Sequence, residues 1–343
     1  MTDIAKYCKN LKKDFTPRKK DSTKPVSCWS EKDIINKKVV DAFVIIFRTQ
    51  GCSWAFKSGC SMCGYFNDSM WEKVSNEDLL KQFEFAMEKY NQEKFVKIFT
   101  SGSFLDDKEI PSVVRKKILK KLAENAEKIS VESRPEYITE KKLLEIKKIL
   151  NDKIFEIGIG LETADDDIRK NLINKGFTFD DYKKAARLLK KYNFLVKTYI
   201  LIKPPFVTEK NAIDDAIKTI EKIKNITDVV SFNPTNVQKN TYVSYLWNRR
   251  KYRPPYLFSV IEILKQSKKI APNVHIKCDV AGGGSIRGAH NCKNCDRSYL
   301  NAISDFSLNQ DTKTFQKLNC DCKQNWLDLL DIEDLAFGSV VDI

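Results

Sequence analysis

The sequence predicts an α/β protein built on a partial (β/α)6 barrel. Six short apolar, β-branched segments alternate with helical patterns, which is typical of a parallel sheet. They span residues 39–234, fewer than the ~250 residues of a full eight-unit TIM barrel. The segments read as apolar on both faces, which suits strands that are covered on both sides. The expected strands are Val39–Phe47, Phe95–Phe99, Ile129–Val131, Phe155–Leu161, Val196–Ile202 and Val229–Phe232.

Helix-start signals lie between these strands. Ser75 and Thr178 are each followed three residues later by an acidic residue, which resembles a capping box. Thr139 and Thr208 predict two further helix starts, and Val113–Ala123 has the spacing of a fifth helix.

Polar groups follow the carboxyl end of every predicted strand. In a β/α barrel these ends meet on one face, where active sites lie. Six polar strand ends therefore predict an active site on that face, at or beside Thr49, Ser101, Ser133, Glu162, Lys203 and Asn233.

The pattern divides the chain into three parts. Residues 1–35 predict a basic arm, either extended or a short helix lying on the body, with a solvated tail as the alternative. Residues 36–247 form the barrel. Residues 248–343 form a cysteine-bearing extension, in which Phe258–Lys269 predicts a helix and Val274–Val280 a strand.

Charge indicates a polyanionic partner. The 60 Lys and Arg residues outnumber the 46 Asp and Glu residues, giving a net charge of +14, which favours nucleic acid. Solvated lysines on helix faces are the alternative. No apolar run approaches the ~20 residues of a membrane span. The beginning of the sequence also lacks the apolar core of a secretory signal, so we expect a cytoplasmic protein without membrane contact.

Three cysteines follow the first predicted barrel strand, as Cys52-x7-Cys60-x2-Cys63. Structural zinc normally takes four protein ligands, and no histidine is near. Three thiolates instead suit a [4Fe–4S] cluster that keeps one iron free for another ligand.

The other cysteine group lies in the C-terminal extension. Cys292, Cys295, Cys320 and Cys322 predict a four-thiolate zinc site, in which His290 is an alternative ligand. A second iron–sulfur cluster and a group that binds no metal are the two alternatives.

At this point the chain resembles the radical S-adenosylmethionine (SAM) superfamily. The looser cysteine spacing is similar to that of the Elongator-catalytic-subunit branch, as are the ESRPE segment at 132–136 and the GIGLET segment at 158–163. The resemblance implies a [4Fe–4S] cluster on Cys52, Cys60 and Cys63. The free iron would bind SAM, and one-electron reduction would cleave the SAM carbon–sulfur bond.

The resemblance also implies roles for residues at the strand ends. Glu162 and Lys203 would act as catalytic residues facing substrate or cofactor. A structural ion pair at the barrel rim is the alternative for each charged residue. The implied cofactor-binding residues, besides the three cysteines, are Tyr65, Ser101, Gly102, Ser103, Glu132 and Arg134.

The segment GCSWAFKSGCSMCGYFND (51–68) and the tail segment GGGSIRGAHNCKNCD (282–296) resemble the archaeal archaeosine-biosynthesis branch. That resemblance implies a two-step reaction on tRNA. A partner transferase subunit attaches lysine to 7-cyano-7-deazaguanine at tRNA position fifteen. The radical enzyme receives electrons from a reductant protein. It then cleaves the carbon–nitrogen bond of the lysine side chain, which leaves archaeosine.

A basic and aromatic stretch follows the barrel and is the expected tRNA contact. Tyr252 or Tyr256 would stack on a base, and a solvated linker is the alternative for the stretch. Its basic members are Arg249, Arg250, Lys251 and Arg253.

Two other functions remain open at this point. One is a different tRNA-modifying radical enzyme, either Elongator-like or methylthiotransferase-like. The other is a non-catalytic zinc and RNA-binding protein.

Overall fold

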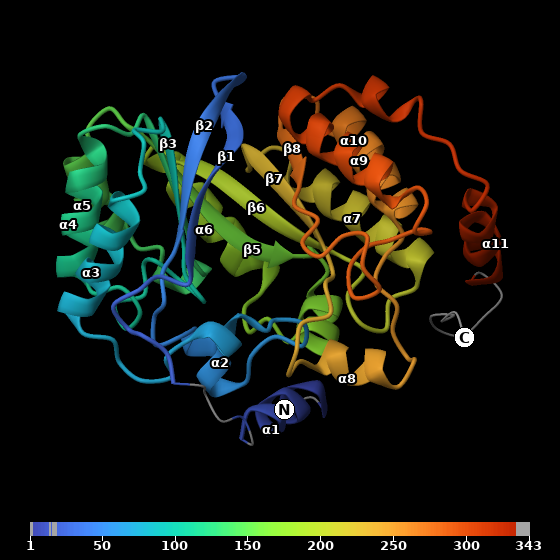
Figure 1. Ribbon diagram of the computed structural model, residues 1–343, viewed down its shortest axis with the longest axis horizontal. Coiled ribbons are helices and arrows are strands. Elements are labelled where there is room, and N and C mark those ends of the chain that lie inside the picture. The colour runs from blue at the N-terminus through green and yellow to red at the C-terminus, as the bar shows by residue number, and fades with distance from the viewer. Residues whose placement is uncertain (1–2, 14, 16–18, 334–343) are drawn as a thin grey trace.

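The structure is a computed structural model that describes residues 3–13, 15 and 19–333 of the chain (Figure 1). Its centre is one eight-stranded sheet in the order β1 to β8. β1 runs antiparallel to β2, and every later neighbour is parallel. The strands are β1 Ser27–Ile35, β2 Lys38–Ile46, β3 Phe95–Phe99, β4 Lys128–Glu132, β5 Ile154–Glu162, β6 Leu195–Ile202, β7 Val229–Pro234 and β8 His275–Cys278.

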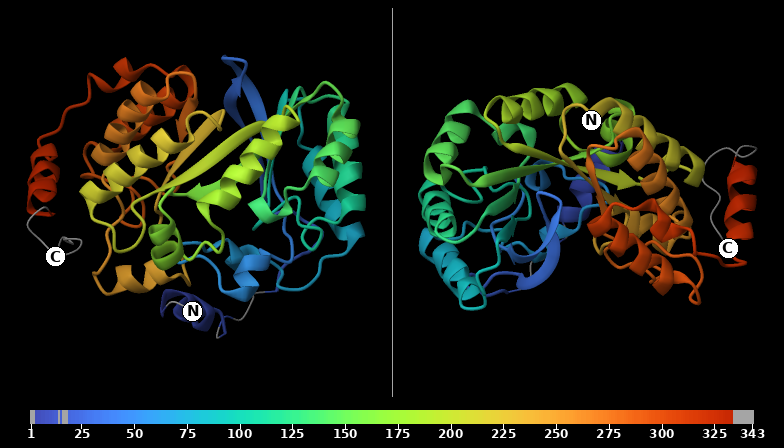
Figure 2. Two further views of the ribbon diagram at one scale, coloured as in Figure 1. Left: turned by 180° about the vertical axis from the view of Figure 1, so that it is seen from behind. Right: turned by 90° about the horizontal axis from the view of Figure 1, so that it is seen from above.

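The sheet curls into a half-barrel with helices around its outside (Figures 1 and 2). The predicted partial barrel is therefore confirmed, and its six expected strands correspond to β2–β7. The helices that connect or follow these strands are α3 Asn76–Met87, α4 Ser112–Ala123, α5 Glu140–Leu150, α6 Phe179–Lys191, α7 Glu209–Ile223 and α9 Leu257–Ile270.

The capping signals correspond to real helix starts. The Ser75 hydroxyl accepts a hydrogen bond from the backbone of Asp78, and Thr178 forms a reciprocal capping box with Asp181. Thr208 caps α7 in the same way as Ser75 caps α3. These bonds satisfy backbone donors that have no partner inside the helix, so they fix where each helix begins.

β1 was not expected, because its sequence SCWSEKDII is polar and mostly solvent-facing. It forms a hairpin with β2 through Asn36 and Lys37, which both have positive φ angles, 49° and 65°. Two such residues match the twist of a tight hairpin, although this turn usually contains glycine.

The two faces of the sheet differ, which corrects the expectation of strands apolar on both faces. Outward-facing residues such as Ile98 and Ile157 are fully buried beneath the helices. Their neighbours along the strands, Lys97 and Glu156, lie on the opposite, inner face and are buried as well. Alternation along each strand separates the two sets, so the half-barrel has an apolar outside and a charged lumen.

Ion pairs join strands across this lumen. The Asp33 carboxylate of β1 contacts the Lys97 ammonium of β3 and lies 3.1 Å from the Lys277 ammonium of β8. Lys128 and Glu156 form another buried pair at 2.7 Å. Asp33 therefore links the sheet's first strand to both its middle and its last strand.

Residues after position 248 extend the same sheet and core. β8 pairs with β7, and α9 packs against α7. The remaining elements are α1 Asp3–Lys13, α2 Ser53–Lys57, η1 Tyr65–Asp68, η2 Pro135–Tyr137, η3 Ile168–Ile173, α8 Tyr242–Asn248, α10 Asp296–Asn309, η4 Thr312–Phe315 and α11 Lys323–Glu333. Among the described residues, no helix has both the length and the apolar character needed to cross a membrane.

Candidate active site at the carboxyl ends of the strands

The three-cysteine loop lies where the parallel strands end, beside α1, α2 and α8 (Figure 1). Burial raises the pKa of the Cys52 thiol to about 11. Burial and the neighbouring Cys60 raise the pKa of Cys63 to about 12. The three thiols therefore lie close enough to influence one another. Ligation to iron would reverse these shifts, because a bound metal deprotonates its thiol ligands.

The predicted N-terminal arm, residues 1–35, contains two described elements: helix α1, which covers this loop, and strand β1, which belongs to the sheet. The Lys12 ammonium donates hydrogen bonds to the carbonyls of Ala55 (3.2 Å) and Ser58 (2.7 Å), at the end of α2. Cys8 is buried, and its own burial, together with Cys60, raises its pKa to about 12 even though Lys12 acts in the opposite sense. The arm thus packs directly on the three-cysteine loop.

The end of β3 fits tightly against the first cysteine. A Cβ atom at Gly102 would lie 2.8 Å from both Cα and Cβ of Cys52, so only glycine leaves room there. Ser101 and Ser69 share a hydrogen bond of 2.8 Å between their hydroxyls. The Ser103 hydroxyl accepts a bond of 3.0 Å from the backbone of Arg134. These contacts join the ends of three neighbouring segments.

Glu109 is a site residue that the sequence reasoning missed. Its buried carboxylate accepts hydrogen bonds from the Thr49 hydroxyl and the Ser103 backbone, both at 2.8 Å. Burial raises its pKa to about 7, and its charge acts on Cys52. Glu109 therefore ties the ends of β2 and β3 together beside the cysteine. Its acidic neighbours in sequence made it look like an ordinary solvated loop residue.

Arg134 connects two sides of the strand-end face. It pairs with Glu136 at 2.5 Å and donates to the Lys175 carbonyl at 3.0 Å. Its guanidinium lies over the rings of Trp54, from the cysteine loop, and Phe177. The side chain is buried, so it positions the cysteine loop against the loop that follows β5.

Glu162 ends β5 at the strand-end face, in a strained backbone. Its φ angle is +68°, and the register of the sheet shifts between Gly160 and Glu162. Such bulges are common beside active sites. Glu162 pairs with Lys175 at 2.5 Å. Burial lowers the pKa of Lys175, but Glu162 and Cys60 together raise it above its ordinary value.

Lys203 forms a structural ion pair, which was the alternative to a catalytic role in the sequence analysis. It is completely buried, and its ammonium lies 2.7 Å from the carboxylate of Glu209. The same carboxylate accepts hydrogen bonds from the Tyr256 backbone and the Ser259 hydroxyl. In this position Lys203 joins β6 to α7 and α9, whereas the expectation was contact with substrate.

The expected tRNA residues divide into two groups. Arg249, Arg250 and Lys251 are exposed after α8. Arg253 is buried and donates to the His290 carbonyl at 3.1 Å. The two aromatic candidates are also buried, and the Tyr252 hydroxyl donates to a backbone carbonyl at 2.7 Å. These buried side chains hold the fold together, so the expectation that they contact tRNA is corrected.

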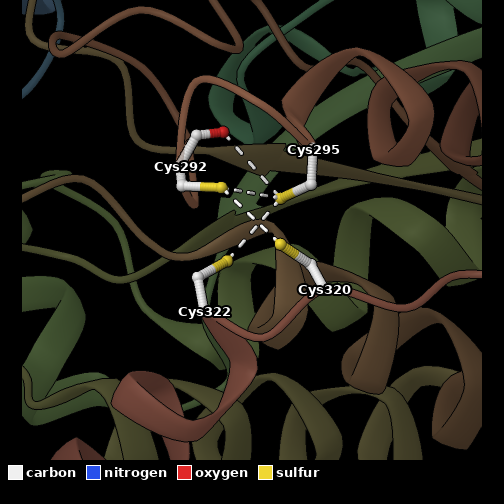
Figure 3. A group of neighbouring side chains, drawn as sticks. All are labelled: Cys292, Cys295, Cys320 and Cys322. Carbon is white, nitrogen blue, oxygen red and sulfur yellow. Dashed lines mark hydrogen bonds between the residues drawn. The ribbon is translucent and has the colours of Figure 1, made fainter.

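The four tail cysteines converge on one point (Figure 3). Neighbouring sulfur atoms are 3.5–3.7 Å apart, and all four lie within 4.8 Å of one another. Four thiolates at ~2.3 Å from one zinc ion would be separated by about 3.8 Å. The His290 ring bonds instead to the Gly288 carbonyl, at 2.7 Å. The group therefore has the dimensions of a single-metal site made by four thiols.

Comparison with known proteins agrees with this geometry. The family described as the Radical SAM superfamily matches residues 46–220. Archaeosine synthase subunit beta of Methanosarcina acetivorans is 42% identical over 324 residues, covering 93% of this chain and 94% of that protein. The protein of the same name from Thermococcus kodakarensis is 40% identical, covering 87% and 94%.

The chain belongs to the radical SAM superfamily and, within it, to the archaeosine synthase subunit beta family. Both resemblances noted from the sequence are thereby confirmed. Among solved structures, the archaeal Methanocaldococcus infernus Elp3 with an N-terminal deletion is similar, with a TM-score of 0.47 and 18% identity. That match covers 67% of this chain and 58% of the other.

Membership of the superfamily makes this chain a radical SAM enzyme and implies a [4Fe–4S] cluster and SAM. The residues present fit such a group. Three thiols come from one loop at the strand ends, and Gly102 leaves the backbone of the first cysteine uncrowded. Tyr65, two residues after Cys63, is 59% exposed and is available to a cofactor.

Proposed function

We propose that this radical SAM enzyme modifies tRNA by completing the synthesis of archaeosine. It would act on lysine-adducted 7-cyano-7-deazaguanine at tRNA position fifteen. The lysine side-chain nitrogen would remain on the base as part of the amidine, and the carbon chain would leave as a lysine-derived fragment. The observation that carries this proposal is 42% identity to an archaeosine synthase subunit beta along nearly the full length of both chains.

In this proposal the chain's own residues hold and orient the reacting groups. Cys52, Cys60 and Cys63 would hold the cluster, which with SAM supplies a hydrogen-abstracting radical when both are bound. Gly102 and Ser103 form the edge beneath Cys52. This arrangement would set the cofactor against the lumen and exclude water from it.

Glu162 would face the cofactor or substrate from the strained end of β5. Its present partner is Lys175, and an incoming ligand would share or displace that ion pair. Glu132 is half-buried at the end of β4, where burial raises its pKa, so it would meet the cofactor or substrate from the lumen side.

The tRNA would bind across the strand-end face through phosphate contacts. The exposed residues Arg249, Arg250 and Lys251 lie after α8, and α1 packs against α8. Lys6 and Lys9 are exposed on α1. Together these five positive charges border the loop that would hold the cluster.

Two associated components complete the proposal. The tail cysteines would bind zinc, because the sulfur separations match one ion rather than the larger four-iron cube. The name "subunit beta" of the relatives supports a partner subunit that transfers lysine to the tRNA. A reductant protein would supply electrons to the cluster.

The test is anaerobic incubation of the reconstituted protein with SAM, reductant and lysine-adducted tRNA, followed by mass spectrometry of the nucleosides. Archaeosine should appear with the wild type and be absent with Cys60→Ala, which lacks a cluster ligand. Cys28→Ala is the matched control, because Cys28 lies in β1 and belongs to neither cysteine group. No archaeosine from the wild type, or wild-type turnover by Cys60→Ala, would refute the proposal.

A further inference from the structure

Within the part of the chain that the structure describes, one buried lysine of the lumen, Lys197, forms no ion pair, in contrast to its neighbours. Lys97, Lys128 and Lys277 each form an ion pair with a carboxylate. Lys197 of β6 is only 3% exposed, yet among the described residues it makes no hydrogen bond and no ion pair within 4.0 Å. Its ammonium lies over the Tyr199 ring, 4.6 Å from the ring centroid. A buried ammonium that no carboxylate contacts directly is costly. Burial and the positive charge of Lys277 accordingly lower its pKa to about 8.

A second lumen group is buried beside Lys197 and a carboxylate. The Tyr199 hydroxyl, two residues further along β6, is buried and interacts with the Glu132 carboxylate of β4. The Glu132 carboxylate of β4 is near enough to raise the pKa of Tyr199, in addition to the effect of burial. Gly158 lies between them on β5, and its missing side chain makes room for the tyrosine ring.

One carboxylate close to these groups is exposed to solvent. Asp279 directly follows β8, and its carboxylate side chain is 59% exposed. Its charge acts on both Lys197 and Tyr199, and also on the exposed Tyr65 of the cysteine loop. Residues from different strands of the half-barrel are therefore within electrostatic range of one another. Ser231 supports Asp279 with a hydrogen bond of 3.2 Å.

These groups are complementary to a zwitterion. We propose that Lys197, Tyr199, Glu132 and Asp279 form a subsite for the free α-amino-acid end of the substrate's lysyl group. The Lys197 ammonium and the Tyr199 hydroxyl would bind the α-carboxylate. The carboxylates of Asp279 and Glu132 would bind the α-ammonium. This inference rests on the proposed function and names the part of the substrate that enters the lumen.

The proposed subsite runs from the strand ends into the lumen, with Lys197 as its deepest member. Lys197 lies five residues before the end of β6, or about 16 Å along the strand. The cysteine loop lies beyond the strand ends. Glu132 ends β4, and the charges of Glu132 and Asp279 both act on Tyr65 of that loop, so the carboxylates lie nearer the cysteine loop than Lys197 does. The α-ammonium of an extended lysyl chain would therefore lie nearer the strand ends, and its α-carboxylate deeper in the lumen.

The experiment compares two tRNA substrates, one with a lysine adduct and one with a lysinamide adduct that lacks the carboxylate charge. For the wild type, kcat/KM should fall by about 10–100-fold on lysinamide, as expected for the loss of one charge-assisted contact. For Lys197→Met, kcat/KM on the lysine adduct should fall by a similar factor, and discrimination between the substrates should disappear. SAM cleavage without tRNA should persist in this variant.

Two further variants make the result decisive. Lys183→Met removes a lysine on the outside of α6 and should retain wild-type discrimination. Asp279→Asn changes an exposed side chain, so it should fold normally and raise KM for the lysine adduct. Undiminished discrimination in Lys197→Met, with archaeosine formed by the wild type, would overturn the subsite alone. No archaeosine from the wild type would overturn the proposed function and the subsite together.

Discussion

Replacing Lys203 with methionine would separate the catalytic expectation from the structural one. The change removes a buried ammonium and leaves the Glu209 carboxylate without its partner at 2.7 Å. Breaking a buried pair typically costs about 3–5 kcal/mol of unfolding free energy. Two hydrogen bonds to Glu209, from Tyr256 and Ser259, survive the change. We therefore expect the lower end, about 3 kcal/mol, and a melting temperature lower by roughly 4 °C.

The assay is thermal and urea unfolding of reconstituted protein, together with archaeosine formation measured well below the melting temperature. Lys203→Met combined with Glu209→Gln should recover part of the lost stability, because no uncompensated charge remains. Lys183→Met, on the outside of α6, should unfold like the wild type. A Lys203→Met protein that unfolds with the wild type but makes no archaeosine would refute the structural assignment and restore a catalytic one.

Three other predictions follow from single contacts. Gly102→Ala should lose most of its iron after anaerobic reconstitution, because the new Cβ would lie 2.8 Å from the Cys52 backbone; wild-type iron content would contradict this. Cys292→Ser should release about one equivalent of zinc and lower the stability of the C-terminal part, while the iron content stays unchanged. His275 has its pKa lowered from 6.5 to about 4, mainly by burial, so the native state excludes a proton that the unfolded state binds. Stability should therefore fall as the pH drops from 6.5 towards 4, by about 2 kcal/mol at pH 5. His275→Gln should remove that part of the pH dependence. Urea unfolding at pH 7 and pH 5 measures the loss of stability in the wild type and in the variant, and an equal loss in both would contradict this role of His275.

The strands and helices were predictable because their outward faces follow simple periodicity. Ile98 and Ile157 are buried under helices whatever the lumen contains, so each strand showed a β-branched apolar signal. Thr178 and Ser75 marked helix starts through a bond between residues three positions apart. The cysteine groups were visible for the same reason, since each ligand pair is local in sequence.

The contacts that were missed join residues far apart in the chain or hide inside an apolar pattern. Glu109 reaches Thr49 across 60 residues, so nothing near either residue marks the bond. Lys203 and Glu209 are six residues apart, but their pairing depends on how α7 and α9 pack. Lys97 and Lys197 interrupt apolar strands, and only the three-dimensional curl shows that they face a common lumen.

The distribution of the site along the chain indicates how one superfamily serves different substrates. The superfamily match ends at residues 46 and 220, and it contains the three cysteines and most of the strand-end contacts. The chain outside this range supplies α1, α8 and β8. Tyr7 of α1 contacts the rings of Tyr242 and Tyr245 in α8, so the two flanking parts meet beside the cysteine loop. The exposed basic residues of α1 and after α8, and Asp279 after β8, also come from these flanks. The shared segment therefore holds the three cysteines and would supply Glu132, Lys197 and Tyr199 to the lysyl subsite, whereas the flanking segments supply Asp279 and the basic surface that would select tRNA.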